Sequence, residues 1–101
     1  GGIAATASDV AKFYKAVFID QKVLGKWGLS QLTADPEKDD YGLGIEVERV
    51  SGLGWVWGHS GSDVGYASDV RLRLSPPAIA VVLAAEEDAY SGATYDMLEE
   101  Y

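Results

Sequence analysis

Residues 66–85 have the sequence YASDVRLRLSPPAIAVVLAA, which predicts two strands joined by a turn. In the first strand, Tyr66–Leu74, apolar side chains alternate with charged ones, so one face is apolar and the other is charged. The segment Ser75-Pro76-Pro77 then reverses the chain. The second strand, Ala78–Ala85, is apolar at every position, and such a strand needs cover on both of its faces.

Two further strands are predicted before this hairpin, at Tyr41–Val50 and Gly54–His59. The turn between them contains two glycines, and the connection Ser60–Gly65 to the next strand is also rich in glycine. In the second of these strands, the two-residue alternation places three side chains on one face: Trp55, Trp57 and His59. Because the four strands follow one another with short turns, we expect an antiparallel meander.

Helices are predicted near both ends of the chain. Ser8–Asp20 carries apolar residues at the spacing of one helical stripe: Val10, Phe13, Tyr14, Val17 and Phe18. Asp88–Tyr101 is predicted as a closing helix and Ser30–Thr33 as a short helical segment. We therefore expect an α+β fold, a single domain over residues 1–101 with a sheet of about four strands and the N- and C-terminal helices packed on one face.

Two helices on one face would leave the other face of the sheet uncovered. Because Ala78–Ala85 is apolar on both faces, we expect that the chain associates with itself or belongs to something larger. The chain also begins with Gly1 instead of Met, and we expect it to be a trimmed or processed piece of a longer protein.

The composition argues against several classes of function. Lys and Arg number 8 against 16 Asp and Glu, and the net charge of -8 repels phosphate backbones and anionic lipids. We therefore expect no nucleic acid and no membrane as partners. The longest apolar run, residues 78–85, is also far short of the ~18 residues that a bilayer requires. The chain has no Cys, which excludes disulfides, thiolate nucleophiles and Cys-based zinc sites.

No complete catalytic motif is present. His59 and Ser60 are adjacent, and neighbours in a strand point to opposite faces, so their side chains should not form a nucleophile–base pair. The glycine pairs at 42–44 and 52–54 are followed by strands instead of helices and do not complete a phosphate-binding motif. With one His and scattered carboxylates, we expect no metal and no cofactor.

Two other groups have simple structural explanations. Glu46 and Glu48 share one face of a strand, for which solvent exposure is the ordinary explanation. Trp55 and Trp57 could stack on a ligand such as a sugar or a base, but tryptophans in strands more often belong to a core or a sheet face.

Four segments carry a family resemblance, and they stand in the family's order. The first is GGIAATASDVAKF at residues 1–13, and the second is YGLG at residues 41–44. The third is WGHSGSDVGY at residues 57–66, and the fourth is the apolar strand that ends at Ala85 together with the last helix. This order resembles the serine β-lactamase-like hydrolases, a family that includes class C β-lactamases, D-alanyl-D-alanine carboxypeptidases and related esterases.

The resemblance implies a site at residues 59–62. His59, Ser60 and Gly61 would stand in the place of the family's third motif, on a strand that forms one wall of the active site. By resemblance, His59 and Ser60 would hold the substrate carboxylate or shuttle protons, and the backbone N–H of Ser62 would supply half of the oxyanion hole. The implied ligand is a small-molecule acyl substrate, and relatives act largely in the periplasm or outside the cell.

Two family motifs are missing. No Ser is followed three residues later by Lys, so the Ser-x-x-Lys nucleophile motif is absent, and without Asn the Tyr-x-Asn motif is absent too. We therefore predict the C-terminal portion of a β-lactamase-like serine hydrolase, a partial fold that is inactive alone and whose partner is a missing N-terminal portion. The alternatives are a non-catalytic binding or self-assembly module, and one chain of a two-chain enzyme.

Overall fold

The fold is an antiparallel sheet between helices. The computed structural model describes residues 3–33, 35, 37–38, 40–86 and 92–100. Its elements, in chain order, are α1 (Ala7–Tyr14), the π-helical turn η1 (Lys15–Ile19), α2 (Lys26–Leu32), β1 (Glu46–Val50), β2 (Gly54–Asp63), β3 (Tyr66–Leu74), β4 (Pro77–Ala84) and α3 (Ala93–Glu99). The strands lie in the order β1-β2-β3-β4, and each pairs antiparallel with the next. The predicted α+β meander is therefore confirmed.

Several boundaries differ from the prediction. β2 continues through Asp63, so most of the predicted connection Ser60–Gly65 is strand, and the turn contains only Val64 and Gly65. β1 begins at Glu46, although Tyr41 forms an isolated bridge with that residue. α2, at Lys26–Leu32, is longer than the predicted short helical segment Ser30–Thr33. α3 occupies the second half of the predicted closing helix, whose residues 88–91 and 101 lie outside the described part of the chain.

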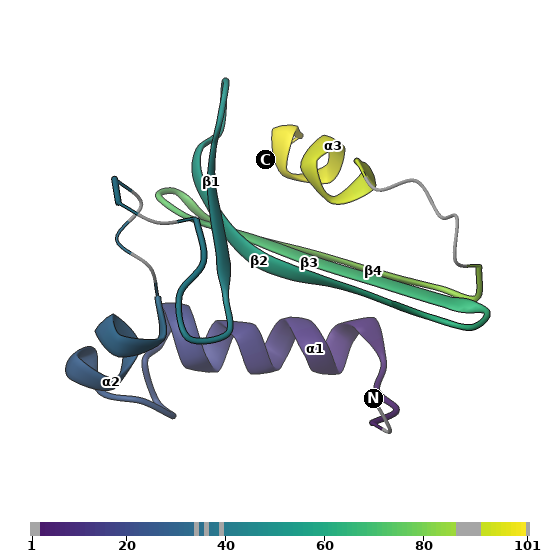
Figure 1. Ribbon diagram of the computed structural model, residues 1–101, viewed down its shortest axis with the longest axis horizontal. Helices are drawn as coiled ribbons and strands as arrows, with labels where there is room; N and C mark the ends of the chain where they lie inside the picture. The colour runs from purple at the N-terminus through teal and green to yellow at the C-terminus, as the bar shows by residue number, and fades with distance from the viewer. Residues whose placement is uncertain (1–2, 34, 36, 39, 87–91, 101) are drawn as a thin grey trace.

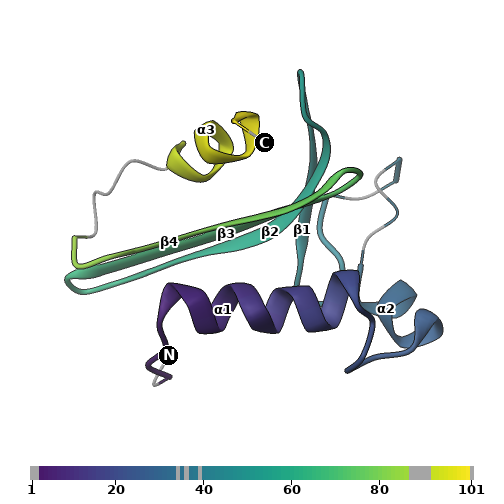
Figure 2. The same cartoon turned by 180° about the vertical axis from the view of Figure 1, so that it is seen from behind.

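The two terminal helices lie on opposite faces of the sheet, so the expectation that both pack on one face is wrong. In Figures 1 and 2, α1 runs along one side of the long β2–β3–β4 ribbon and α3 lies on the other side. The cause is the two-sided apolar surface of β4. Ile79 packs against the core on the α1 side, whereas its neighbour Ala80 belongs to the core on the α3 side.

Each face of the sheet has its own hydrophobic core. The buried residues of the core on the α1 side are Val17, Phe18, Ile45 and Leu72. Those of the core on the α3 side are Leu53, Val56, Ala80 and Leu98. The sheet residues of the two cores alternate along the strands, so a slip of one residue in the pairing register would exchange the two sets.

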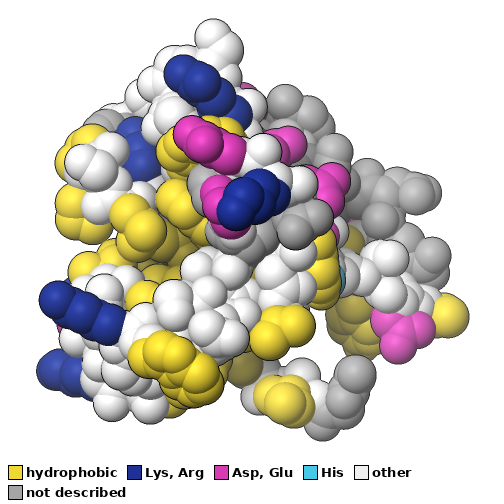
Figure 3. All heavy atoms as spheres, turned by 60° about the vertical axis from the view of Figure 1, so that its left-hand side comes forward, with side chains coloured by type: hydrophobic (Ala, Val, Ile, Leu, Met, Phe, Trp, Pro, Cys, Tyr) yellow, Lys and Arg dark blue, Asp and Glu magenta, His cyan; other side chains and the backbone are white. Residues whose placement is uncertain are grey.

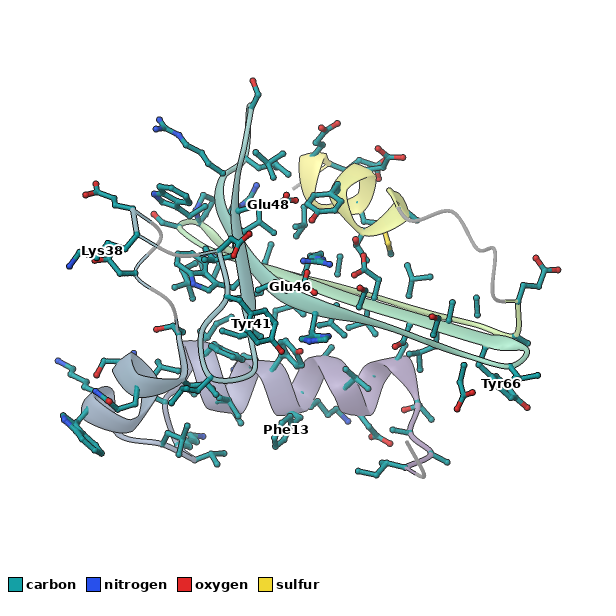
Figure 4. The ribbon with its side chains drawn as sticks, viewed as in Figure 1. Phe13, Lys38, Tyr41, Glu46, Glu48 and Tyr66 are labelled. Atoms are coloured by element: carbon teal, nitrogen blue, oxygen red, sulfur yellow. The ribbon has the colours of Figure 1, made fainter. Side chains whose placement is uncertain are left out.

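The apolar stripe of the first helix is only partly buried. Thr6 caps its N-terminus, since its Oγ1 accepts a hydrogen bond of 3.1 Å from the amide of Asp9. Val17 and Phe18 are buried in η1, whereas Phe13 is 60% exposed and points away from the sheet (Figure 4). Figure 3 shows hydrophobic side chains exposed on the side of the molecule that it brings forward, close to lysine and arginine side chains.

Candidate functional site

The predicted site residues lie on the part of β2 that extends beyond β1. β1 pairs with residues 54–58 of β2, and β3 pairs with residues 57–63. From His59 to Asp63, β2 therefore has a neighbouring strand on one side only within the described residues. All four candidates, His59, Ser60, Gly61 and Ser62, fall on this stretch, which we call the free edge of β2.

The pairing register sets the direction of the backbone groups on the free edge. Asp63 and Tyr66 flank a two-residue turn and form the first bonded pair of the hairpin. Mutual hydrogen bonds in an antiparallel ladder join alternate pairs. His59 and Gly61 therefore bond to β3, whereas the N–H and C=O groups of Ser60 and Ser62 point away from it.

The imidazole of His59 is held at both ring nitrogens. Its Nδ1 lies 2.6 Å from the carbonyl oxygen of Ser60, and its Nε2 lies 2.9 Å from the hydroxyl oxygen of Tyr41. The two rings meet edge to face, with centroids 5.7 Å apart. Because a carbonyl oxygen only accepts hydrogen bonds, Nδ1 carries the proton in the neutral ring, and Nε2 accepts from the Tyr41 hydroxyl.

The side chains of His59 and Ser60 lie on opposite faces, as the strand alternation predicts. His59 is half-buried and its register partner is Val70, whereas Ser60 is exposed and its register partner is Asp69. The described residues thus contain no hydrogen bond between the two side chains. Gly61 leaves space for the side chain of Ser68, because a Cβ at position 61 would lie 2.9 Å from the Ser68 hydroxyl oxygen. The Ser62 side chain is exposed.

The two tryptophans of β2 serve the structure. Trp57 packs against the core on the α1 side, and its indole Nε1 is buried without a hydrogen-bond partner among the described residues. Trp55 lies under the guanidinium of Arg49, with 5.8 Å from the Arg49 Cζ to the ring centroid. Trp57 is therefore a core residue, whereas Trp55 is covered by Arg49 and also lines an open groove.

A buried ion-pair network on the α3 side was missed by the sequence analysis. Arg71 is buried, and its guanidinium binds Asp69 at 2.9 Å and Glu46 at 3.0 Å. Asp69 also accepts a hydrogen bond of 2.5 Å from the hydroxyl of Thr94, which is fully buried in α3. The expectation that Glu46 is simply solvent-exposed is therefore wrong, because it supplies one of the two counter-charges of a buried cation.

The same network extends to the last helix. The Tyr95 hydroxyl donates to a carboxylate oxygen of Glu48, and the Tyr95 ring lies under Arg71, with 5.6 Å between the guanidinium carbon and the ring centroid. Arg73 is also buried and donates to the carbonyl oxygen of Leu98 at 3.3 Å. The charged face of β3, which resembles a solvent-exposed face in the sequence, is therefore the docking surface for α3.

The network perturbs two pKa values. Burial acts to lower the pKa of the Arg71 guanidinium, but the opposing charge of Asp69 and the hydrogen bonds to Glu46 and Asp69 raise it above its ordinary value. Burial, followed by the hydrogen bond to Glu48, raises the pKa of the Tyr95 hydroxyl far above its ordinary value. Arg71 is therefore a fixed cation and Tyr95 a fixed hydrogen-bond donor.

An open groove of about 440 Å³ lies beside this network. Among the described residues, its lining contains three carboxylates, two tyrosines and one cation, Arg71: Asp40, Tyr41, Glu46, Val47, Glu48, Arg71 and Tyr95. Among the described residues, no group of three or more His, Cys, Asp or Glu side chains is arranged to hold a metal ion. The described helices include none that is long and apolar enough to cross a membrane.

The described residues therefore form a small α+β meander in which the free edge of β2 carries the histidine. Comparisons of the chain with protein-family models, with curated proteins and with solved structures found no match.

Proposed function

We propose that this chain is the C-terminal portion of a β-lactamase-like serine hydrolase, with the free edge of β2 as one wall of its acyl-transfer site. The parent enzyme hydrolyses an amide, a β-lactam or an ester through a serine acyl-enzyme. The observation that carries the proposal is the placement of His59, Ser60, Gly61 and Ser62 together on a strand edge that no described strand covers.

The edge has the properties that an oxyanion donor needs. The hydrogen bonds of Gly61 and Asp63 to β3 fix the backbone on either side of Ser62, and the register points the Ser62 N–H outward. A donor that is already oriented stabilises the charge on a tetrahedral intermediate without reorganisation during the reaction. This supports the role of Ser62 as half of the oxyanion hole.

The nucleophile has to come from elsewhere. No Ser in the sequence is followed three residues later by Lys, and the side chains of His59 and Ser60 lie on opposite faces of β2. Without a nucleophile, only oxyanion and binding effects remain. The isolated chain is therefore inactive, and its partner is the missing N-terminal portion or, in a two-chain enzyme, a separate polypeptide.

Covalent labelling tests this proposal. A fluorescent penicillin and a fluorophosphonate should leave the purified 101-residue chain without an adduct. In the native source, the protein or complex that carries these residues should be labelled by at least one of the probes, with the adduct mapped by mass spectrometry to a serine outside residues 1–101. An adduct on a serine of these residues, or a native protein that neither probe labels, would overturn the proposal.

One observation favours the second candidate, a self-assembly module. β4 is the last strand of the sheet, and its outer edge is unpaired in the described residues although the strand carries no charged side chain. Such edges recruit further strands. Self-assembly predicts a dimer in sedimentation experiments. Leu83→Lys on β4 should dissociate this dimer, whereas Leu43→Lys, at an exposed leucine away from β4, should leave it intact. A wild-type monomer at all concentrations would contradict it.

A further inference from the structure

We propose that Tyr41 is a positioning residue that fixes the orientation and the tautomer of His59 at the free edge of β2. For its role in catalysis, the inference rests on the proposed function. It concerns a residue outside the third-motif segment, eighteen positions before His59, and it is drawn from the contact between the two side chains.

The backbone holds Tyr41 in place. The residue forms a bridge with Glu46, the first residue of β1, and the next amide, that of Gly42, donates to the Ile45 carbonyl oxygen at 2.8 Å. The amide of Leu43 donates to the Leu32 carbonyl oxygen at 2.9 Å, which ties the loop to the end of α2. Ile45 itself is buried in the core on the α1 side, so this loop is anchored at both of its ends.

The positions of the Ser60 carbonyl, the His59 ring and the Tyr41 hydroxyl are consistent with one another. The Ser60 carbonyl points toward the free edge because of the strand register, and His59 Nδ1 binds that carbonyl at 2.6 Å. The imidazole therefore turns from its face of the sheet toward the edge, where Tyr41 meets its other nitrogen at 2.9 Å. Figure 4 shows Tyr41 and Glu46 close together at the β1 end that is nearer to α1.

This arrangement assigns each atom a role. Nδ1–H donates to Ser60, Nε2 accepts from the Tyr41 hydroxyl, and the Tyr41 oxygen keeps its own lone pairs for a further donor. The Tyr41 side chain belongs to a residue that is 48% exposed, so its oxygen is the outer end of the chain of hydrogen bonds that begins at Ser60. A ligand at this edge would therefore contact the Tyr41 hydroxyl, because the Nε2 of His59 is already hydrogen-bonded to that hydroxyl.

Nitrogen NMR of the isolated chain tests the inference without any assay of activity. The chain has a single histidine, so its two ring nitrogens give one unambiguous pair of signals. In the neutral ring, the Nδ1–H tautomer should predominate. Tyr41→Phe removes the donor to Nε2 and should shift the tautomer ratio toward Nε2–H by about 2- to 12-fold, the equivalent of one hydrogen bond.

Tyr66→Phe is the matched control, because Tyr66 is also an exposed tyrosine and pairs with Asp63 at the far end of the same hairpin. It should leave the tautomer ratio unchanged. A wild-type spectrum dominated by Nε2–H, or a Tyr41→Phe spectrum with the wild-type ratio, would overturn the inference. Probe labelling and the tautomer are measured separately, so a failure of the hydrolase proposal and a failure of this inference give different results.

Discussion

Arg71 of β3 and Glu46 of β1 form an ion pair across the strand between them, with 3.0 Å from the Arg71 Nη1 to the Glu46 Oε2. Both residues have Gly58 of β2 as their register partner. The arginine therefore crosses β2 at a residue without a side chain. This contact joins three strands on the face where α3 docks, so it couples the position of β1 to that of the last helix.

Gly58→Ala should destabilise the fold by about 1–3 kcal/mol, as overpacking of a core does. A Cβ at this position would collide with the Val70 carbonyl oxygen and approach the Arg71 Cδ to 2.8 Å. The carbonyl belongs to the backbone of β3 and can move only with the strand. Urea unfolding followed by tryptophan fluorescence measures the change.

Gly25→Ala is the control for this substitution. Gly25 has φ of -69°, and a Cβ there would meet no atom within 4 Å. Its replacement should change the free energy of unfolding by less than about 0.5 kcal/mol. Equal changes in the free energy of unfolding for the two substitutions would contradict the close approach of β2 and β3 at Gly58.

Arg71→Leu should cost about 3–5 kcal/mol, because it leaves a buried carboxylate without its cation. Asp69 has only 15% of its side chain exposed and would keep Thr94 as its hydrogen-bond donor. Arg49→Leu removes a more exposed arginine that stacks on Trp55 and should cost no more than about 1 kcal/mol. Thermal unfolding of the two variants gives the comparison, and similar melting temperatures would contradict the buried network.

Tyr95→Phe should destabilise the protein by about 0.5–1.5 kcal/mol at neutral pH, through the lost hydrogen bond to Glu48. The folded-state pKa of Tyr95 is raised above its unfolded value of about 10. The contribution of this hydroxyl is therefore complete below pH ~10 and is lost as the pH rises through the folded pKa.

Unfolding experiments on wild type and Tyr95→Phe across this range provide the measurement. The difference in unfolding free energy between the two proteins should stay constant up to pH ~10 and shrink above it. A difference that instead appears only above pH ~10 would mean that the sign of the linkage is wrong and that Tyr95 ionises more easily in the fold than outside it.

The sequence predicted local structure well where one periodicity dominates. The alternation in Tyr66–Leu74 gave β3 its observed bounds, and the short turns gave the antiparallel order. The side of the sheet on which α3 packs was predicted wrongly because β3 has charged residues on that face. Burial of Arg71 depends on Glu46, 25 positions earlier, and a pairing over this distance has no local signal.

The candidate site was predicted only in part. The alternation correctly separated the His59 and Ser60 side chains, but residues 60–63 were predicted as part of a glycine-rich connection and belong to β2. The contact with Tyr41 was not predicted. The contact depends on where β1 begins, since a strand that starts at Glu46 leaves residues 59–63 of β2 without a partner on that side. It also depends on the loop before β1, which places Tyr41 beside Glu46.

A pair of substitutions in the first helical segment tests how this segment meets the sheet. Phe18 is buried in the core on the α1 side and Phe13 is exposed, although both belong to the same apolar stripe in the sequence. Phe18→Ala should destabilise the isolated chain by about 3–5 kcal/mol, whereas Phe13→Ala should change its stability by less than about 0.5 kcal/mol. Chemical unfolding under identical conditions decides between this arrangement and a loosely attached helix. If the helix did not pack on the sheet in the isolated chain, the two phenylalanines would have equally small effects, because neither would lose buried contacts.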